Sequence, residues 1–201
     1  MSQPLEFQGT KLWKGLLSRE VQVGIVADLR SMSERAPLRR YVTPGGREMS
    51  VRMSGAGARA WLSDKDGYRY SEVQPDGRSW PEIPSSILRV WKKVADVSRS
   101  PDSCLVNFYG EDTKMGLHQD RDEAELNWPV VSISLGDDAL FRVGGVERRD
   151  PTKSVWLTSG DVVVLAGPSR LAYHGIDRVK FGSSSLLPRG GRINVTLRVA
   201  T

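Results

Sequence analysis

Apolar residues recur at every third or fourth position in two segments of the first hundred residues. The first segment starts after Ser18, a residue type that caps helices, and stops before Pro37. Its apolar face consists of Val21, Ile25, Leu29 and Met32. The second segment follows Pro84, with Ser85 or Ser86 as its cap. Its apolar face consists of Ile87, Val90, Trp91, Val94 and Val97. Both patterns predict amphipathic helices that pack against the rest of the protein.

Between these segments, turn-forming residues alternate with aromatic residues. The turn signals are the stretches 43–46, 55–57 and 75–77, which are rich in glycine and proline. The aromatic residues between them are Trp61, Tyr68 and Tyr70. This pattern predicts hairpins on the surface.

From residue 103 the pattern changes to short β-rich runs separated by Gly, Asp, Pro and Asn. The predicted strands are 103–109, 115–119, 130–136, 139–143, 154–157, 161–166, 170–174 and 192–199. Many short strands in such a length are typical of a double-sheet jelly roll. We therefore expect a mainly β fold with flanking helices. Residues 1–100 would form helices and hairpins packed on a jelly-roll core of residues 101–201, and the two would make one compact domain.

The composition fits a single core and excludes several classes of protein. The 201 residues are 39% hydrophobic, and no stretch approaches the roughly 20 apolar residues that a membrane-spanning helix needs. The N-terminus lacks the apolar run of a secretory signal. A single cysteine, Cys104, excludes an internal disulfide, and two histidines exclude a Cys/His zinc cluster. We expect a cytoplasmic protein without a membrane partner.

The positive charge is concentrated in the first half of the chain. Residues 1–100 hold 17 Lys and Arg against 11 Asp and Glu, whereas residues 101–201 hold 12 against 13. A basic surface favours a polyanionic partner, because each neutralised phosphate releases counterions. A solvated basic face without any partner explains the same charge.

The last predicted strand alternates polar and apolar side chains. Arg192, Asn194, Thr196 and Arg198 share one face because successive strand residues point in opposite directions. That face either meets solvent or lines the inside of the jelly roll. Two guanidinium groups in the interior would need anionic partners, and a small dicarboxylate could satisfy both.

Both histidines of the chain are candidate metal ligands. His118 and Asp120 are two residues apart, so on a strand they point the same way, and His174 ends another predicted strand. Two histidines and one carboxylate form the facial triad of non-haem Fe(II) oxygenases. An isolated His-x-Asp is more often a hydrogen-bonded pair. A dicarboxylate such as 2-oxoglutarate would link the triad to the arginine strand, because it could chelate iron and meet an arginine.

Together these motifs resemble one known family, the AlkB-like Fe(II)/2-oxoglutarate dioxygenases, and most closely the bacterial members that repair alkylated nucleic acids. The matching pieces span about residues 40–200. They are Val42–Gly46, Met49–Val51, Cys104–Tyr109, Leu117–Asp120, His174 and Arg192-x-Asn194-x-Thr196-x-Arg198. Arg47 departs from the family pattern, where an aromatic residue is familiar, and this leaves the preferred substrate length open.

The resemblance implies a double-stranded β-helix with an N-terminal nucleotide-recognition lid, and a role for each matching residue. Fe(II) would be held by His118, Asp120 and His174. The co-substrate 2-oxoglutarate, which reacts with O2, would be held by Asn107, Tyr109, Arg192, Asn194 and Arg198. The substrate would be contacted by Trp61, Tyr68, Tyr70, Asp122 and Arg148.

Several of these residues have structural interpretations as well. Tyr109 could be a core aromatic residue, and Trp61 could pack the lid instead of stacking on an unpaired base. Asp122 could face a cationic methylated base, or it could pair with Arg121 or a nearby lysine. The basic residues that could meet phosphates, or could be solvated, are Arg39, Arg40, Arg47, Arg52 and Arg59.

The expected function is oxidative demethylation of 1-methyladenine and 3-methylcytosine in single- or double-stranded DNA, and in RNA as a further substrate. This reaction releases formaldehyde and repairs the base by direct reversal. We expect the enzyme to act as a monomer. Two alternatives are a dioxygenase of the same chemistry that acts on a protein, lipid or small molecule, and a metal-free jelly-roll module that binds an anion.

Overall fold

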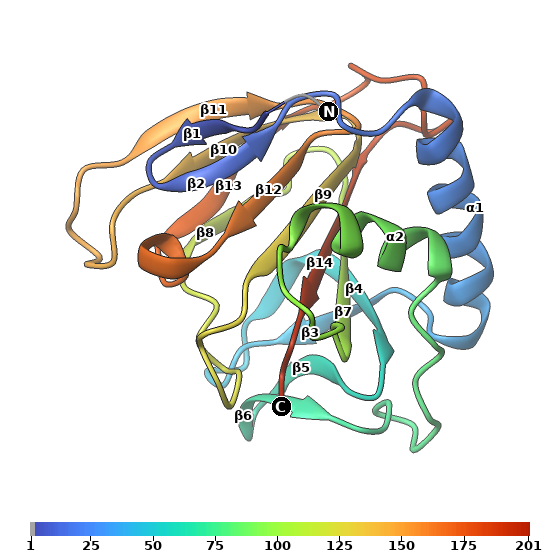
Figure 1. Cartoon of the computed structure of the whole chain (residues 1–201). Helices are drawn as coiled ribbons and strands as arrows, with labels where there is room; N and C mark the ends of the chain where they lie inside the picture. The colour runs from blue at the N-terminus through green and yellow to red at the C-terminus, as the bar shows by residue number, and fades with distance from the viewer. Residues whose placement is uncertain (1–2) are drawn as a thin grey trace.

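The computed structural model describes residues 3–201 and is mainly β, with two α-helices (Figure 1). The helices are α1 (Arg19–Arg35) and α2 (Ser85–Val94), and Gly167–Ser169 form a 3-10 turn. The strands of the first half are β1 (Leu5–Phe7), β2 (Thr10–Trp13), β3 (Arg39–Val42), β4 (Glu48–Gly57), β5 (Ala60–Asp64) and β6 (Gly67–Ser71). Those of the second half are β7 (Ser103–Tyr109), β8 (Met115–His118), β9 (Val130–Gly136), β10 (Asp138–Val143), β11 (Lys153–Leu157), β12 (Val162–Leu165), β13 (His174–Lys180) and β14 (Arg192–Arg198).

The strands form a large sheet, a small sheet and a separate hairpin. The eight-stranded major sheet has the order β1-β2-β12-β9-β14-β7-β4-β3, and the four-stranded minor sheet has the order β11-β10-β13-β8. β5 and β6 form the hairpin. All the strand pairings are antiparallel. The two facing sheets confirm the expected jelly-roll architecture.

The side chains of the major sheet divide into two faces with different partners. On β7, Cys104 and Val106 join the apolar cluster formed with α1 and α2, whereas Leu105 and Tyr109 join the cluster between the two sheets. On β14, Val195 belongs to the helix side in the same way. The polar residues of β14 therefore face the minor sheet. Of the two orientations open to this strand, the structure has the interior one.

The two helices occur where the periodicity predicts them, with differences at their ends. The Ser18 side chain accepts a hydrogen bond from the Val21 amide at 3.5 Å, which confirms the cap of α1, but Val21 itself is exposed. In α2 neither serine is the cap, because the helix begins at Ser85 directly after Pro84. Val97 lies beyond the end of α2 and is exposed. Neither helix among residues 3–201 is long and apolar enough to cross a membrane.

The two hairpins between α1 and α2 have different positions in the fold. The β5–β6 hairpin is separate from the sheets, as expected, and we call it the lid hairpin. The β3–β4 hairpin is instead the edge of the major sheet, where β4 pairs with β7 from Arg52 opposite Phe108 to Gly57 opposite Ser103. Strands from both halves of the chain are thus hydrogen-bonded in one sheet.

One predicted strand is wrong. Residues 170–173 follow the 3-10 turn as a turn and an irregular segment, and β13 begins at His174, where the prediction ended a strand. Ala172 is buried in the core here without pairing in a sheet. The other seven predicted strands are present with shifts of one residue at most at their ends.

Candidate active site

A cavity of about 400 Å³ opens between the two sheets and below the lid hairpin. All the residues that the sequence predicts for the site line it, including the three proposed metal ligands, the five proposed co-substrate residues and the five proposed substrate residues. A cavity of this size is in the range of small-molecule sites. The fold therefore brings together side chains that are up to 137 residues apart, from Trp61 to Arg198.

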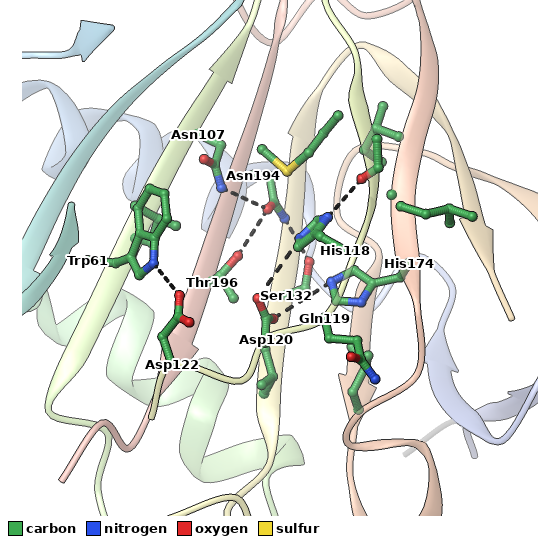
Figure 2. A pocket seen from close by; sticks show the side chains of 18 of the residues that line it. Trp61, Asn107, His118, Gln119, Asp120, Asp122, Ser132, His174, Asn194 and Thr196 are labelled. Carbon is green, nitrogen blue, oxygen red and sulfur yellow. Dashed lines mark hydrogen bonds and ion pairs between the residues drawn. The ribbon is translucent and has the colours of Figure 1, made fainter. Parts of the chain in front are cut away.

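His118, Asp120 and His174 converge at the minor-sheet wall of the cavity (Figure 2). The two histidines are direct partners across β8 and β13. The Nε2 atoms of His118 and His174 lie 4.0 and 3.7 Å from the carboxylate oxygens of Asp120. One ligand atom from each residue lies within 4.8 Å of the others. The expectation that Asp120 lies on the strand is wrong, because β8 ends at His118 and Asp120 approaches from the following loop.

Backbone carbonyl groups fix both imidazole rings with one nitrogen facing the centre. The Nδ1 atom of His118 lies 2.9 Å from the Gly116 oxygen, and that of His174 lies 2.9 Å from the Ala172 oxygen. A carbonyl oxygen only accepts, so Nδ1 carries the proton and Nε2 of the neutral ring keeps its lone pair. This is how metal-binding histidines are oriented in many proteins.

The charges of the three residues also suit a divalent cation. Burial, together with the neighbouring His118, lowers the pKa of His174 to about 4, so its ring is neutral near pH 7. Burial would raise the pKa of Asp120, but Arg198 and the two histidines outweigh that effect and hold it well below its ordinary value. The Oδ2 atom of Asp120 is buried without a hydrogen-bond partner. A carboxylate oxygen and two imidazole lone pairs fit Fe(II).

Arg192 stands at the other end of the cavity without a counter-charge. It is 1% exposed, its Nη2 donates to Ser134 Oγ at 3.1 Å, and its guanidinium lies 5.1 Å from the centre of the Tyr109 ring. Its Nε and Nη1 have no hydrogen-bond partner, and within residues 3–201 no carboxylate pairs with it. Burial lowers the pKa of Arg192. A buried guanidinium with free donors is costly, so this position fits a bound carboxylate.

A row of polar side chains lies between the arginine and the triad. Asn194 Nδ2 donates to Ser132 Oγ at 2.7 Å, while Asn194 Oδ1 accepts from Thr196 Oγ1 at 3.0 Å and from Asn107 Nδ2 at 3.4 Å (Figure 2). Tyr109 is fully buried with its hydroxyl 3.6 Å from the Met115 sulfur. Tyr109 is thus both a core aromatic residue and part of the cavity wall.

The rim of the cavity carries the aromatic residues of the lid hairpin. The Trp61 ring stacks on Tyr68 with centroids 5.6 Å apart and an interplanar angle of 17°. Tyr41 packs against the same indole in a T-shaped contact, with centroids 6.4 Å apart. Trp61 Nε1 donates to Asp122 Oδ2 at 2.8 Å (Figure 2). Trp61 therefore packs the lid and faces the cavity at once, and Asp122 has an indole as its partner in place of the alternative Arg121 or lysine.

The remaining basic residues have three kinds of surroundings. Arg148 lines the cavity, with Nη1 3.4 Å from the Leu117 oxygen and its guanidinium 5.7 Å from the Tyr173 ring centre. The guanidinium of Arg52 instead lies over Phe108 on the helix side of the major sheet. Three others are already paired with carboxylates, which reduces their availability for phosphates. These are Arg39 with Asp76, Arg40 with Glu48, and Arg59 with Glu72.

Comparisons with known proteins agree with this geometry. Residues 9–198 match the family described as the 2OG-Fe(II) oxygenase superfamily. The chain is 52% identical over 193 residues to an alpha-ketoglutarate-dependent dioxygenase AlkB homolog of Caulobacter vibrioides, which covers 96% of this chain and 88% of that protein. It is 41% identical to alpha-ketoglutarate-dependent dioxygenase AlkB of Escherichia coli K12, over 88% of this chain and 83% of the relative. The chain belongs to the AlkB-like 2OG-Fe(II) dioxygenases.

A solved structure supports the fold of this AlkB-like dioxygenase. The structure titled "The structure of OsALKBH1" superposes with a TM-score of 0.80 at 33% identity and covers 96% of this chain and 99% of that one. As a 2OG-Fe(II) oxygenase, the enzyme uses Fe(II), 2-oxoglutarate and O2. The donor set of the triad and the free donors of Arg192 fit the metal and a carboxylate of the co-substrate, respectively.

Two buried residues behind the triad, Glu123 and Arg170, were not predicted from the sequence. Glu123 forms ion pairs with Arg170 and Arg198, each at 3.1 Å, and Arg170 also donates to the Asp120 carbonyl oxygen at 2.6 Å. Arg198 contacts Asp120 Oδ1 at 2.7 Å. The only signal for Glu123 is its place in an acidic run after Asp120, and Arg170 gives none because its partners are about 50 residues away.

Proposed function

We propose that this dioxygenase removes N-methyl groups from 1-methyladenine and 3-methylcytosine in DNA, and in RNA as a further substrate, with release of formaldehyde. The observation that carries the proposal is the rim of the cavity. A stacked Trp61 with an adjacent carboxylate, Asp122, stands beside the triad. A planar ring that carries a positive charge suits this pair, because it can stack on an indole and face a carboxylate.

The residues of the rim would select and hold the methylated base. A base must leave its stack to enter a cavity of this kind, and stacking on Trp61 would replace part of the lost stacking energy. Asp122 already accepts a hydrogen bond from the indole, so its other oxygen can face the cationic base. Arg148 and the exposed Tyr68 lie at the same opening and would contact the rest of the nucleotide.

The residues of the cavity floor would hold the metal and the co-substrate. His118, Asp120 and His174 would bind Fe(II), which supplies the oxidation of the methyl group by O2 coupled to decarboxylation of 2-oxoglutarate to succinate. Arg192 would bind one carboxylate of 2-oxoglutarate, supported by Tyr109, Asn107 and Asn194. Arg198 would orient Asp120. Its Nη1 has no hydrogen-bond partner in the protein and would be available to donate to the co-substrate.

The names of relatives support a nucleic-acid substrate. Two relatives from Arabidopsis thaliana, each 33% identical over 94% of this chain, are named DNA N(6)-methyladenine demethylases. The chain covers only about half of their length, 48% and 49%. A mouse relative is named nucleic acid dioxygenase ALKBH1. The charge of the first half of this chain, 17 Lys and Arg against 11 Asp and Glu, is consistent with a polyanionic substrate.

The test is formaldehyde release from single- and double-stranded oligonucleotides that carry 1-methyladenine or 3-methylcytosine. We expect release that requires Fe(II) and 2-oxoglutarate and is absent with the unmodified oligonucleotide. Release only from methylated peptides or small molecules, with all oligonucleotides inactive, would contradict the proposal.

We also propose that the enzyme acts in the cytoplasm as a monomer. A nucleic-acid substrate and a single cysteine that is buried and free support this placement. Light scattering of the purified enzyme should give the mass of one chain, 22.3 kDa.

A further inference from the structure

Four buried charges form a cluster directly behind the metal centre. They belong to Asp120, Glu123, Arg170 and Arg198, whose side chains are 7%, 1%, 4% and 7% exposed. Arg198 bridges the two carboxylates, with Nη2 2.7 Å from Asp120 Oδ1 and Nε 3.1 Å from Glu123 Oε1. Arg170 pairs with the second oxygen of Glu123 at 3.1 Å. The carboxylate of Asp120 therefore depends on Glu123 for the position of its own guanidinium partner.

Arg170 fixes the backbone of the same loop. Its Nη1 donates to the Asp120 carbonyl oxygen at 2.6 Å, and its Nε donates to the Trp128 carbonyl oxygen at 2.7 Å. Asp120 lies in this loop, beyond the end of β8, and gains no support from a strand. Glu123 thus acts on Asp120 by two routes, through Arg198 on the side chain and through Arg170 on the backbone.

The lid hairpin reaches this cluster through a single hydroxyl group. Tyr70 on β6 donates to Glu123 Oε1 at 2.7 Å, which is the oxygen that also pairs with Arg198. Burial raises the pKa of Tyr70, so the hydroxyl remains a donor. The second contact from the lid hairpin to this loop, Trp61 to Asp122, ends on an exposed carboxylate at the rim. Only the Tyr70 contact continues to a proposed metal ligand.

We propose that Glu123 is a positioning residue that couples the lid hairpin to the metal centre through the chain Tyr70, Glu123, Arg198 and Asp120. The inference rests on the proposed nucleic-acid substrate, which would hold the hairpin over the cavity. A hairpin held in this position keeps the Tyr70 hydroxyl on Glu123, and Glu123 and Arg198 then keep Asp120 oriented for the metal. Binding of the oligonucleotide and binding of the metal therefore strengthen each other, and by thermodynamic linkage the effect is reciprocal.

The experiment compares metal affinity with and without substrate in three proteins. Mn(II) is titrated calorimetrically into the metal-free enzyme with 2-oxoglutarate under anaerobic conditions, alone and with a saturating oligonucleotide that carries 1-methyladenine. In the wild-type protein we expect the oligonucleotide to tighten Mn(II) binding about fivefold or more. Tyr70→Phe removes only the hydroxyl and should bind Mn(II) equally with and without the oligonucleotide. The matched control is Ser71→Ala, which removes a hydroxyl from the same strand that bonds only to Val73, and it should behave as wild type.

A second variant and a second measurement distinguish loss of the coupling between oligonucleotide and metal from a general loss of metal binding. Glu123→Gln should lose the coupling and also weaken Mn(II) binding without the oligonucleotide, because it removes the charge that holds both arginines. Tyr70→Phe should form more succinate per formaldehyde than the wild type, because 2-oxoglutarate turnover is no longer linked to the substrate.

The outcomes distinguish this inference from the proposed function. If the oligonucleotide tightens Mn(II) binding by Tyr70→Phe as much as by the wild type, the inference is overturned. Wild-type enzyme that binds and demethylates the oligonucleotide with no change in Mn(II) affinity also overturns it, and leaves the proposed function standing. Wild-type enzyme that neither binds nor demethylates the oligonucleotide overturns both.

Discussion

The floor and the rim of the cavity are built in different ways. The floor consists of side chains from β7 and β14 of the major sheet, from β8 and β13 of the minor sheet and, for Asp120, from the loop after β8. Its polar groups are fixed by backbone carbonyls or by buried partners. The rim consists of a two-stranded hairpin and residues 122–123 of the loop after β8, joined by two side-chain hydrogen bonds. A two-stranded hairpin has little stability of its own, so the side chains around it decide its position.

This difference suggests a division of labour. The floor holds the chemistry in a geometry that exists without substrate, because the triad and Arg192 are already oriented. The rim would add recognition of the substrate on a less supported element. Changes in the floor should therefore affect all turnover, whereas changes in the rim should affect only turnover that requires the nucleic acid.

The largest effect should come from the floor, with Asp120→Ala. The variant removes the only carboxylate of the triad, and we expect loss of both formaldehyde release and oligonucleotide-independent succinate formation. Both products are measured with saturating Fe(II), and circular dichroism checks that the variant is folded. Succinate formation at the wild-type rate would show that Asp120 does not hold the metal.

The next effect should come from the far end of the floor, with Arg192→Met. Loss of a charge-assisted contact to a carboxylate should raise the KM for 2-oxoglutarate about 10- to 100-fold. Without co-substrate, the free energy of unfolding should not fall, because the variant removes a buried charge that has no partner.

These two measurements check each other. Urea unfolding without 2-oxoglutarate measures how much the unpaired guanidinium of Arg192 lowers the free energy of unfolding. The KM for 2-oxoglutarate measures how much the same group contributes to co-substrate binding. An unchanged KM would contradict the role of Arg192, and a large loss of stability would show that it already has a partner in the protein.

A smaller and more selective effect should come from the rim, with Trp61→Ala. Loss of one stacking platform, worth about 1–3 kcal/mol, should lower kcat/KM for the methylated oligonucleotide roughly 5- to 150-fold. Succinate formation without oligonucleotide should stay near the wild-type rate. The control is Trp156→Ala, an indole that is 39% exposed on β11 and does not line the cavity. Equal losses of both activities in Trp61→Ala would mean that Trp61 supports the floor.

The smallest effect is a pH dependence of stability that belongs to the floor. In the metal-free protein the pKa of His174 is lowered to about 4, while the unfolded chain has the ordinary value near 6.5. The unfolded state then binds more protons between these values, so the free energy of unfolding should fall as the pH falls through this window. His174→Gln should flatten this slope in urea unfolding at a series of pH values. An equal slope in the variant would assign the effect to another group.

Part of the floor could be predicted from local patterns, whereas the rim residues were predicted from the family resemblance, and all of them line the cavity. The alternation along 192–198 is a local pattern that β14 preserves, whereas the His-x-Asp pair converges although Asp120 lies in the loop beyond β8. The face of β14 that turns inward follows from its neighbours β7 and β9, with which it pairs in register. Val106 on β7 and Ile133 on β9 lie opposite Val195 and join it in the cluster on the helix side. No pattern within β14 itself decides between the two faces.

Ion pairs between residues that are far apart in the sequence could not be predicted from such local patterns. Glu123 meets Arg170 and Arg198 across 47 and 75 residues, and the spacing carries no trace of these contacts. The predicted strand at 170–174 is wrong for a related reason. Leu171 and Ala172 are apolar, and Ala172 is buried, but both follow the 3-10 turn without pairing in a sheet, and periodicity cannot distinguish such a segment from a short strand.

The central claim is that the floor binds metal and co-substrate while the rim presents a methylated base to them. The most direct test is a crystal structure of the enzyme grown anaerobically with Mn(II), 2-oxoglutarate and a single-stranded oligonucleotide that carries 1-methyladenine. We expect Mn(II) on His118, Asp120 and His174, a 2-oxoglutarate carboxylate on Arg192, and the methylated base stacked on Trp61 with its methyl group toward the metal. A co-substrate carboxylate bound away from Arg192, or a methylated base outside the cavity, would contradict the account.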